Sequence, residues 1–239
     1  MKQVFITGAS KGLGKAIAEA HLKQGDLVVG ISRTSTIESK NYQHIELDLN
    51  DFSSLSQFEF VFNPQADAYL LYNNAGILGE VKHLGNWSLD SLQSIMNVNV
   101  TAPLFLTNQF VRANCNEKQA KYVLHIGSGA GERPIDGWGQ YCASKAALHM
   151  ASRVFEEELK LNEAVSIKQL TISPGVIDTE MQAEIRQANE GHFSQLQRFK
   201  SLKEQNELKS AEKIADKIIR NFDKLFNQEE PIQLLSQYS

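Results

Sequence analysis

The sequence has little cysteine, and its two cysteines, Cys115 and Cys142, stand outside any cluster. Neither has the spacing of a zinc ligand set or of a disulfide framework. The six histidines are scattered along the chain in the same way. We therefore expect two free thiols and no metal site.

An excess of charge of one sign and a long apolar run are also missing. The formal net charge is −4 with 22% charged residues, an ordinary balance that offers no basic surface for nucleic acid or a membrane. The first residues enter a short apolar run, 3–7, and glycines follow at once, which leaves no room for a signal peptide or a spanning helix. We expect a cytoplasmic protein that binds neither nucleic acid nor a membrane.

Short apolar runs alternate with longer helix-like segments along the chain. Seven of these runs are predicted strands: Gln3 to Thr7, Leu27 to Ser32, His44 to Leu47, Ala68 to Tyr72, Tyr122 to Ile126, Ser166 to Ile172 and Ile232 to Leu235. Strands that alternate with helices form a parallel sheet covered on both faces. We predict one α/β domain over residues 1–239, with a doubly wound, seven-stranded parallel sheet and helices on both faces.

One segment departs from this alternation. Residues 182–210 are polar and charged, with only sparse apolar positions. We predict helices, over about 179–210, that cover a substrate cleft.

A glycine-rich turn follows the first predicted strand and opens a helix. Gly8 permits a sharp turn, Gly12 lets the backbone approach a pyrophosphate, and Gly14 allows close packing, while the helix N-terminus favours an anion. A turn without a nucleotide is the alternative, but the flanking strand and helix favour a dinucleotide. The loop residues assigned to the cofactor are Gly8, Ser10, Lys11, Gly12, Leu13 and Gly14.

The choice between the two nicotinamide cofactors is read at the end of the second predicted strand. Arg33 stands where an acidic residue would bind the ribose of NAD, and with Lys11 it offers two cations for a 2′-phosphate. We predict NADP(H); the alternative is two solvated surface charges. Asp48 and Leu49 follow the third strand and are assigned to the adenine, although Asp48 also fits a helix N-cap or a turn.

Tyr141 and Lys145 are spaced to share one face of a helix. A phenol titrates at about 10, and a neighbouring ammonium brings that pKa closer to neutrality. Ser128 follows an apolar run, where its hydroxyl can hydrogen-bond a substrate carbonyl alongside the tyrosine. These three residues predict a site for proton exchange with a carbonyl or alcohol. A Tyr-x-x-x-Lys alone is frequent on exposed helix faces, so the prediction rests on the surrounding motifs.

The motifs occur in the order typical of the short-chain dehydrogenase/reductase family. In sequence order they are the glycine turn, Asn73-Asn74-Ala75-Gly76, Asn99, Ser128, Tyr141-x-x-x-Lys145 and Pro174-Gly175. The chain resembles this family over essentially its whole length. The resemblance implies a Rossmann fold and a catalytic tetrad of Asn99, Ser128, Tyr141 and Lys145.

The resemblance also implies roles in cofactor binding. Asn74, Ala75 and Gly76 would line the adenosine ribose, and Lys145, beside Tyr141, would bind the nicotinamide ribose. Asn99 would hold a water that links the lysine to solvent; a structural role in distorting its helix is compatible with this. The loop over the nicotinamide would comprise Pro174, Gly175, Val176 and Thr179.

A narrower resemblance lies around the tyrosine and the later loop. Gly137-Trp138-x-x-Tyr141-Cys142-x-x-Lys145 and the run 174–182 are similar to sepiapterin reductases and to the related bacterial benzil reductases. This resemblance implies reduction of ketones or vicinal dicarbonyls with NADPH. Sepiapterin reductases hold the pterin with an aspartate near the last strand. No aspartate stands there in this sequence, which disfavours a pterin and leaves an aromatic or aliphatic dicarbonyl open; Glu229 or Glu230 is the candidate substitute.

The candidate substrate contacts, besides Ser128 and Tyr141, are Trp138 and Met181. The Trp138 ring could pack on an aromatic ketone, or it could be a core residue. Core or lid packing also fits Met181 and Phe193. The expected reaction is hydride transfer from NADPH, with Tyr141 donating the proton.

Other functions remain open from the sequence. A 3-oxoacyl thioester or another carbonyl or alcohol is the alternative substrate, and a non-catalytic NADP(H) sensor or a structural subunit is the alternative class. The intact tetrad disfavours both non-catalytic readings. The family resemblance implies a homodimer or homotetramer that pairs segments Leu89 to Ala113 and Gly139 to Leu161.

Overall fold

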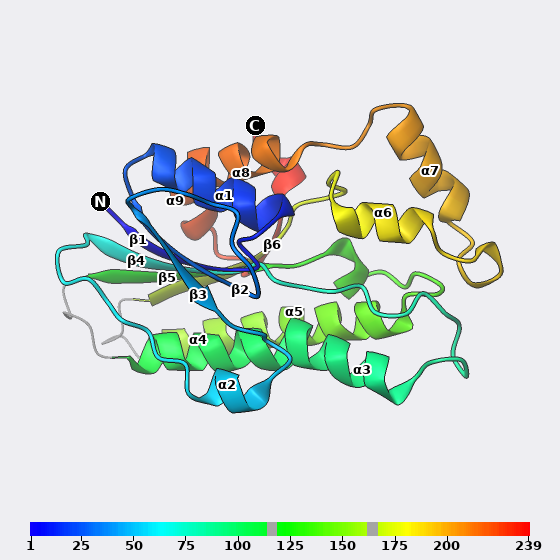
Figure 1. The fold of residues 1–239 in the computed structure, drawn as a ribbon, viewed down its shortest axis with the longest axis horizontal. Coiled ribbons are helices and arrows are strands. Elements are labelled where there is room, and N and C mark those ends of the chain that lie inside the picture. The colour runs from blue at the N-terminus through cyan, green and yellow to red at the C-terminus, as the bar shows by residue number, and fades with distance from the viewer. Residues whose placement is uncertain (114–118, 162–166) are drawn as a thin grey trace.

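The computed structural model describes residues 1–113, 119–161 and 167–239, and its strands form one parallel sheet. The order across the sheet is β3-β2-β1-β4-β5-β6-β7 (Figure 1). The strands are β1 (Gln3–Thr7), β2 (Leu27–Ser32), β3 (Tyr42–Glu46), β4 (Ala68–Asn73), β5 (Ala120–Ile126), β6 (Ile167–Ser173) and β7 (Ile232–Leu234). The predicted doubly wound Rossmann fold is confirmed.

The strand boundaries differ from the predicted ones mainly at the sheet edge. The inner strand β1 is buried along its whole length, as its continuous apolar run predicts. The edge strand β3 has half-exposed residues and begins at Tyr42, two residues before the prediction, because an edge strand needs no apolar run. The predicted start of the sixth strand, Ser166, and Cys115 lie outside the described residues.

Helices cover both faces of the sheet (Figure 1). On one face lie α1 (Gly12–Lys23), α8 (Ala211–Arg220) and α9 (Phe222–Phe226); on the other lie α3 (Leu89–Met96), α4 (Ala102–Arg112) and α5 (Gly139–Lys160), with the short α2 (Phe52–Ser56) outside them. Each face has its own apolar core. Ile17 and Ile214 pack there on one side, and Leu106 and Phe110 on the other.

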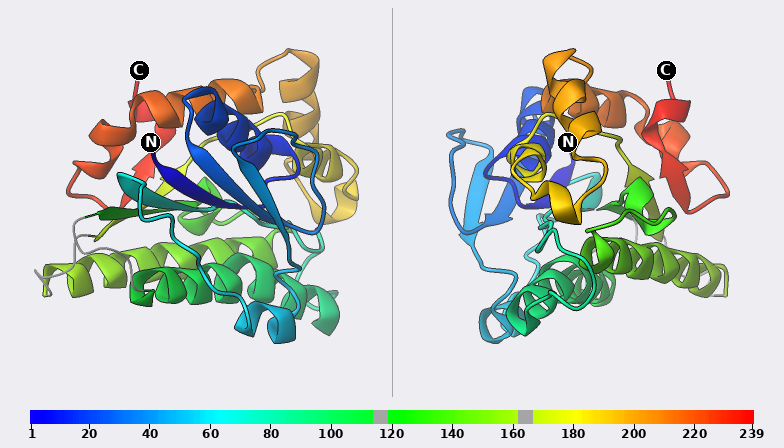
Figure 2. Two further views of the ribbon diagram at one scale, coloured as in Figure 1. Left: turned by 60° about the vertical axis from the view of Figure 1, so that its left-hand side comes forward. Right: turned by 90° about the vertical axis from the view of Figure 1, so that its right-hand side faces the viewer.

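The segment predicted to be helical lies beyond the carboxyl end of the sheet. It forms α6 (Glu180–Arg186) and α7 (Leu196–Glu204), joined by a short 3₁₀ turn, and we call residues 179–210 the lid (Figure 2). The lid has a separate aromatic and aliphatic cluster that includes Phe193 and Phe199. Within the described ranges, no helix combines the length and the apolar character needed to cross a membrane.

Candidate active site

The carboxyl ends of the parallel strands bring the predicted site residues to one edge of the sheet. The glycine turn follows β1, Asn74 follows β4, Ser128 follows β5 and Pro174 follows β6. In an open α/β sheet, ligands bind in the crevice at this edge. The fold therefore assembles into one region motifs that are far apart in the sequence.

Tyr141 and Lys145 lie one turn apart on α5, and both are buried, at 7% and 4% exposure. The Lys145 Nζ atom donates to the carbonyl oxygen of Ile126 at 2.9 Å and lies 5.7 Å from the centre of the Tyr141 ring. Because Ile126 ends β5, this bond holds the helix against the strand that leads to Ser128. The Ser128 hydroxyl accepts from the Ala130 amide at 3.2 Å and forms a hydrogen bond with Tyr141.

Burial controls the titration of both groups. It raises the pKa of Tyr141 to about 12, against the effect of the hydrogen bond with Ser128, which lowers it. Burial also lowers the pKa of Lys145 to about 8. The prediction that Lys145 brings the tyrosine pKa toward neutrality is wrong for this structure, because desolvation disfavours both charged forms.

Asn99 lies in a single π-helical turn, Asn97–Thr101, between α3 and α4. Its side chain is 1% exposed and clamps Ile77, accepting from the Ile77 amide at 2.8 Å and donating to the Ile77 carbonyl at 2.9 Å. The second amide hydrogen goes to Ser144 Oγ at 3.1 Å. The predicted helix distortion is present, and π-turns are frequent at functional sites.

The glycine turn has the geometry of an anion cradle. Gly8 and Gly12 have positive φ angles of 69° and 55°, which favour glycine. A Cβ on Gly14 would lie 2.3 Å from the Gly8 carbonyl oxygen, so only glycine permits this approach. Lys11, the N-cap of α1, makes no capping hydrogen bond with its side chain in the described part of the chain, which leaves first-turn amides for an anion. The turn therefore fits a pyrophosphate.

Thr7 joins the glycine turn to the strand beside it, a role that the sequence analysis did not assign. Its hydroxyl oxygen accepts from the amides of Asn74 and Ala75, both at 3.0 Å. The Asn74 amide group donates in return to the carbonyls of Thr7 at 2.9 Å and Gly8 at 3.3 Å. Gly76 follows, and a Cβ there would lie 3.6 Å from Lys145 Nζ. Asn74, Ala75 and Gly76 thus connect the glycine turn to Lys145.

Comparison with known proteins agrees with this geometry. The profile of the short-chain dehydrogenases matches residues 2–190. The chain is 38% identical over 230 residues to the benzil reductase ((S)-benzoin forming) of Bacillus subtilis, covering 94% of each chain. The chain belongs to the short-chain dehydrogenase/reductase family.

Other relatives place the chain in the benzil reductase subgroup of this family. The Bacillus cereus benzil reductase is 36% identical over 234 residues, covering 92% of this chain and 93% of that one. Among solved structures, the KRED1-Pglu enzyme aligns with a TM-score of 0.76 at 25% identity, over 92% of this chain and 94% of that chain. Members of this family are oxidoreductases that use nicotinamide cofactors on carbonyl or alcohol groups.

The two cations predicted for a 2′-phosphate differ in their surroundings. Arg33 follows β2 and is exposed. Lys11 instead forms an ion pair with Glu180, the first residue of α6. A Cβ on Gly12 would lie 3.4 Å from the Thr179 methyl group, so the start of the lid lies against the glycine turn. Glu180 is a residue that sequence reasoning missed, because nothing local links it to Lys11.

The remaining predicted cofactor residues are placed at the same edge. Asp48 is exposed and its carboxylate accepts from the Asn50 amide at 2.9 Å, which is the turn geometry considered as an alternative. Leu49 is buried at 7% exposure. The last loop bends at Gly175, with φ of 85°, and exposes Val176.

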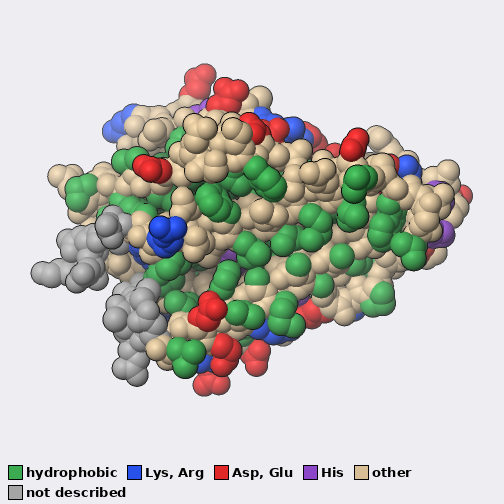
Figure 3. All heavy atoms as spheres, turned by 90° about the horizontal axis from the view of Figure 1, so that it is seen from below, with side chains coloured by type: hydrophobic (Ala, Val, Ile, Leu, Met, Phe, Trp, Pro, Cys, Tyr) green, Lys and Arg blue, Asp and Glu red, His purple; other side chains and the backbone are tan. Residues whose placement is uncertain are grey.

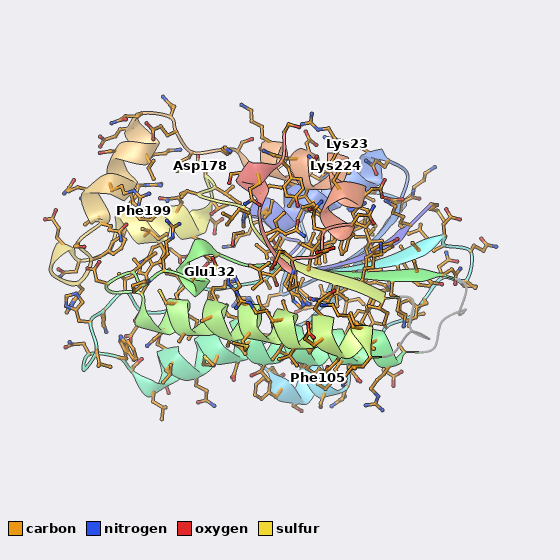
Figure 4. All side chains as sticks on the ribbon, turned by 180° about the vertical axis from the view of Figure 1, so that it is seen from behind. Lys23, Phe105, Glu132, Asp178, Phe199 and Lys224 are labelled. Atoms are coloured by element: carbon orange, nitrogen blue, oxygen red, sulfur yellow. The ribbon has the colours of Figure 1, made fainter. Side chains whose placement is uncertain are left out.

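Trp138 and the lid form an aromatic wall beside the tyrosine. The Trp138 ring is 6% exposed, meets Tyr141 edge-on at 5.6 Å and stacks on Phe193 at 5.4 Å, with interplanar angles of 82° and 17°. Phe199 closes the group at 5.4 Å from Trp138, and Figure 4 shows it in the lid beyond the sheet. Met181 packs against this cluster. The core packing considered for Trp138 is therefore present, and its contact with a substrate stays a prediction.

The suggested acidic substitute for a pterin contact lies at the wrong edge. Glu229 and Glu230 precede β7, and because β7 is parallel to β6, they sit at the amino end of the sheet. They line a cavity there of about 620 Å³ together with the end of α5. The four residues predicted to form the tetrad lie at the opposite end, so neither glutamate reaches Tyr141.

Proposed function

We propose that this protein is an NADPH-dependent carbonyl reductase that acts on a ketone or a vicinal dicarbonyl. The observation that carries the proposal is the packing of Tyr141 between Ser128, Lys145 and the Trp138 ring at the carboxyl edge of the sheet. Similarity to two benzil reductases over most of the chain supports the substrate class. The whole chain would act as one cytoplasmic catalytic domain.

Cofactor binding would use the glycine turn and the residues around it. The α1 amides and Gly12 would hold the pyrophosphate, Arg33 and Lys11 the 2′-phosphate, and Lys145 the nicotinamide ribose. The bound cofactor supplies the hydride. The open cradle at Gly8 and the uncapped start of α1 support this assignment.

Proton transfer would be the task of Tyr141. With a pKa raised to about 12, its phenol stays protonated at neutral pH, which is the form required to donate to the carbonyl oxygen. Ser128 would donate to the same oxygen as charge develops on it. Lys145, with a pKa of about 8, keeps its positive charge at neutral pH beside the phenol. The aromatic wall of Trp138 would exclude water from the reacting carbonyl.

The proposal is tested by measuring the rate of NADPH oxidation with each of several substrates: benzil, other 1,2-diketones, sepiapterin and an acetoacetyl thioester. We expect turnover of diketones that is lost in Tyr141→Phe, with NADH as the cofactor control. A preference for the thioester would transfer the proposal to the alternative substrate. Tight NADPH binding without any turnover would instead favour an NADP(H) sensor.

We also propose a homodimer or homotetramer assembled through α4 and α5. Exposed apolar side chains lie on these helices: Val111 at 38%, Val154 at 45% and Met150 at 57%. Figure 3 shows hydrophobic side chains distributed over the face that these helices form. Light scattering should give a multiple of the 26.7 kDa chain mass, and Val154→Glu should shift it toward the monomer.

A further inference from the structure

His149 lies on the same face of α5 as the two catalytic residues. Tyr141, Lys145 and His149 follow at intervals of four, and all three are buried. His149 is 1% exposed, although the proposed reaction does not use it. Its ring faces the turn after β5 that carries Ser128.

The imidazole touches this turn on both sides of Ser128. A Cβ on Gly127 would lie 2.8 Å from His149 Nε2, and a Cβ on Gly131 would lie 2.7 Å from its Cε1. Neither glycine has a positive φ, so their conformation does not require glycine. A side chain at either glycine is excluded by the close approach of the ring, together with the Thr171 methyl group, 2.5 Å from a Cβ on Gly127, and the Lys145 backbone, 2.9 Å from a Cβ on Gly131. His149 therefore fills the space between α5 and the turn and sets their separation.

Burial of the ring favours its neutral form. Glu132 Oε1 lies 3.9 Å from Nδ1, and Arg153 lies 3.6 Å from the same carboxylate. Burial, Lys145 and Arg153 lower the pKa of His149, and only Glu132 opposes them. The residue of β6 that lies beside this turn is Thr171, which carries no charge. The ring nitrogens have no hydrogen-bond partner among the described residues, so shape rather than hydrogen bonding fits the ring to the turn.

We propose that His149 is a positioning residue that fixes Ser128 relative to Tyr141 during carbonyl reduction. Ser128 forms a hydrogen bond with Tyr141 across the gap between the turn after β5 and α5. His149 packs between the same turn and the same helix, two helical turns further along α5. An ångström of displacement at a reacting group can cost about 10²-fold in rate. The inference rests on the proposed function, because it assigns Ser128 to that reaction.

A double-mutant cycle tests whether His149 acts through Ser128. We expect His149→Ala to lower kcat about 10- to 100-fold, with little change in KM or in NADPH affinity. Ser128→Ala should cost about 10²- to 10³-fold. On the Ser128→Ala background, His149→Ala should cost less than about 3-fold. Equal factors on both backgrounds, or no loss in kcat, would overturn the proposal.

The control is His21→Ala, which removes a histidine that is equally buried, at 1% exposure, on α1 across the sheet. Its effect on kcat should be the same on both backgrounds, because it lies away from the turn. If His149→Ala fails to fold, His149→Gln carries the same cycle, and its longer side chain should restore part of kcat.

An amide NMR spectrum separates failure of this proposal from failure of the proposed function. If the wild-type protein reduces no carbonyl in the panel, the proposed function is wrong. The signals of Gly129 and Ala130 should still shift in His149→Ala and stay in place in His21→Ala. Unmoved signals in His149→Ala would overturn the positioning role independently of any substrate.

Discussion

Asn99 and Ser144 are joined by a hydrogen bond of 3.1 Å that connects the π-turn to α5. Ser144 lies between Tyr141 and Lys145, is fully buried, and donates its own hydroxyl to the Tyr141 carbonyl at 2.8 Å. The Ser144 hydroxyl therefore links Asn99 in the π-turn to the backbone of Tyr141.

Replacing Ser144 by alanine should weaken both stability and turnover. The change leaves a buried amide donor of Asn99 without a partner, which costs about 1–3 kcal/mol in the free energy of unfolding. We expect kcat to fall while NADPH affinity stays, measured by urea unfolding, NADPH oxidation and fluorescence titration. Ser152→Ala is the control, because this serine is equally buried on α5 and bonds Thr171 at 2.5 Å. A loss of kcat as large in Ser152→Ala would contradict the specific role of Ser144.

The fold and the placement of Tyr141 and Lys145 on one helix face were predictable because their signals are local. Apolar runs mark the buried strands, and a spacing of four marks Tyr141 and Lys145 on one helix face. The edge strand β3 was misplaced by two residues at its start because it is half-exposed and lacks that signal.

What the sequence could not supply depends on tertiary contacts. Lys11 and Glu180 are 169 residues apart, so no spacing rule pairs them. The pKa of Tyr141 was predicted from one neighbour, but the burial that raises it comes from several segments packed together. The cation effect is local to α5, whereas desolvation is a property of the assembled site.

The lowered pKa of Lys145 gives a pH dependence with a definite sign. In the free enzyme the ammonium loses its proton near pH 8, so kcat/KM for reduction should fall above that pH. Lys145→Arg stays charged throughout, and its profile should remain flat through this range at a lower rate. If kcat/KM of Lys145→Arg falls above pH 8 in the same way as in the wild-type protein, another group causes the fall.

The same shift affects folding. The pKa in the folded protein is below the ordinary value of 10.5, so the unfolded chain binds more protons between about pH 8 and 10.5. The free energy of unfolding of the cofactor-free protein should therefore rise with pH across this window. Comparison of urea denaturation at the two ends tests this, and Lys145→Met should remove the increase. If the free energy of unfolding of the wild-type protein instead falls between pH 8 and 10.5, by the same amount as that of Lys145→Met, the pKa of Lys145 is not lowered.

Trp138 should determine selectivity for aromatic substrates. Trp138→Phe keeps most of the packing with Phe193 and Phe199 and leaves no hydrogen bond broken, because the indole N–H has no partner in the described part of the chain. We expect KM for benzil to rise about 2- to 10-fold, which corresponds to the binding free energy of one aromatic contact. KM for 2,3-butanedione should stay unchanged. Trp138→Ala should cost about 3–5 kcal/mol of stability. Equal changes in KM for both diketones would place the ring away from the substrate.

Arg33 and Glu180 should have opposite effects on the choice of cofactor. Arg33→Ala removes a cation assigned to the 2′-phosphate, so KM for NADPH should rise about 10- to 100-fold while KM for NADH stays within a factor of about two. Glu180→Gln removes the carboxylate that pairs with Lys11, which frees that ammonium for the same phosphate, so KM for NADPH should fall. The ion pair is exposed, at 61% and 66%, so its loss should hardly change stability and the effect should appear in binding.

The matched control is Asp178→Asn, which breaks the neighbouring Lys203 pair without freeing Lys11. Steady-state kinetics with both cofactors decides between these outcomes: a fall in KM that is equal for NADH and NADPH would mean that Glu180 acts on the lid and not through Lys11.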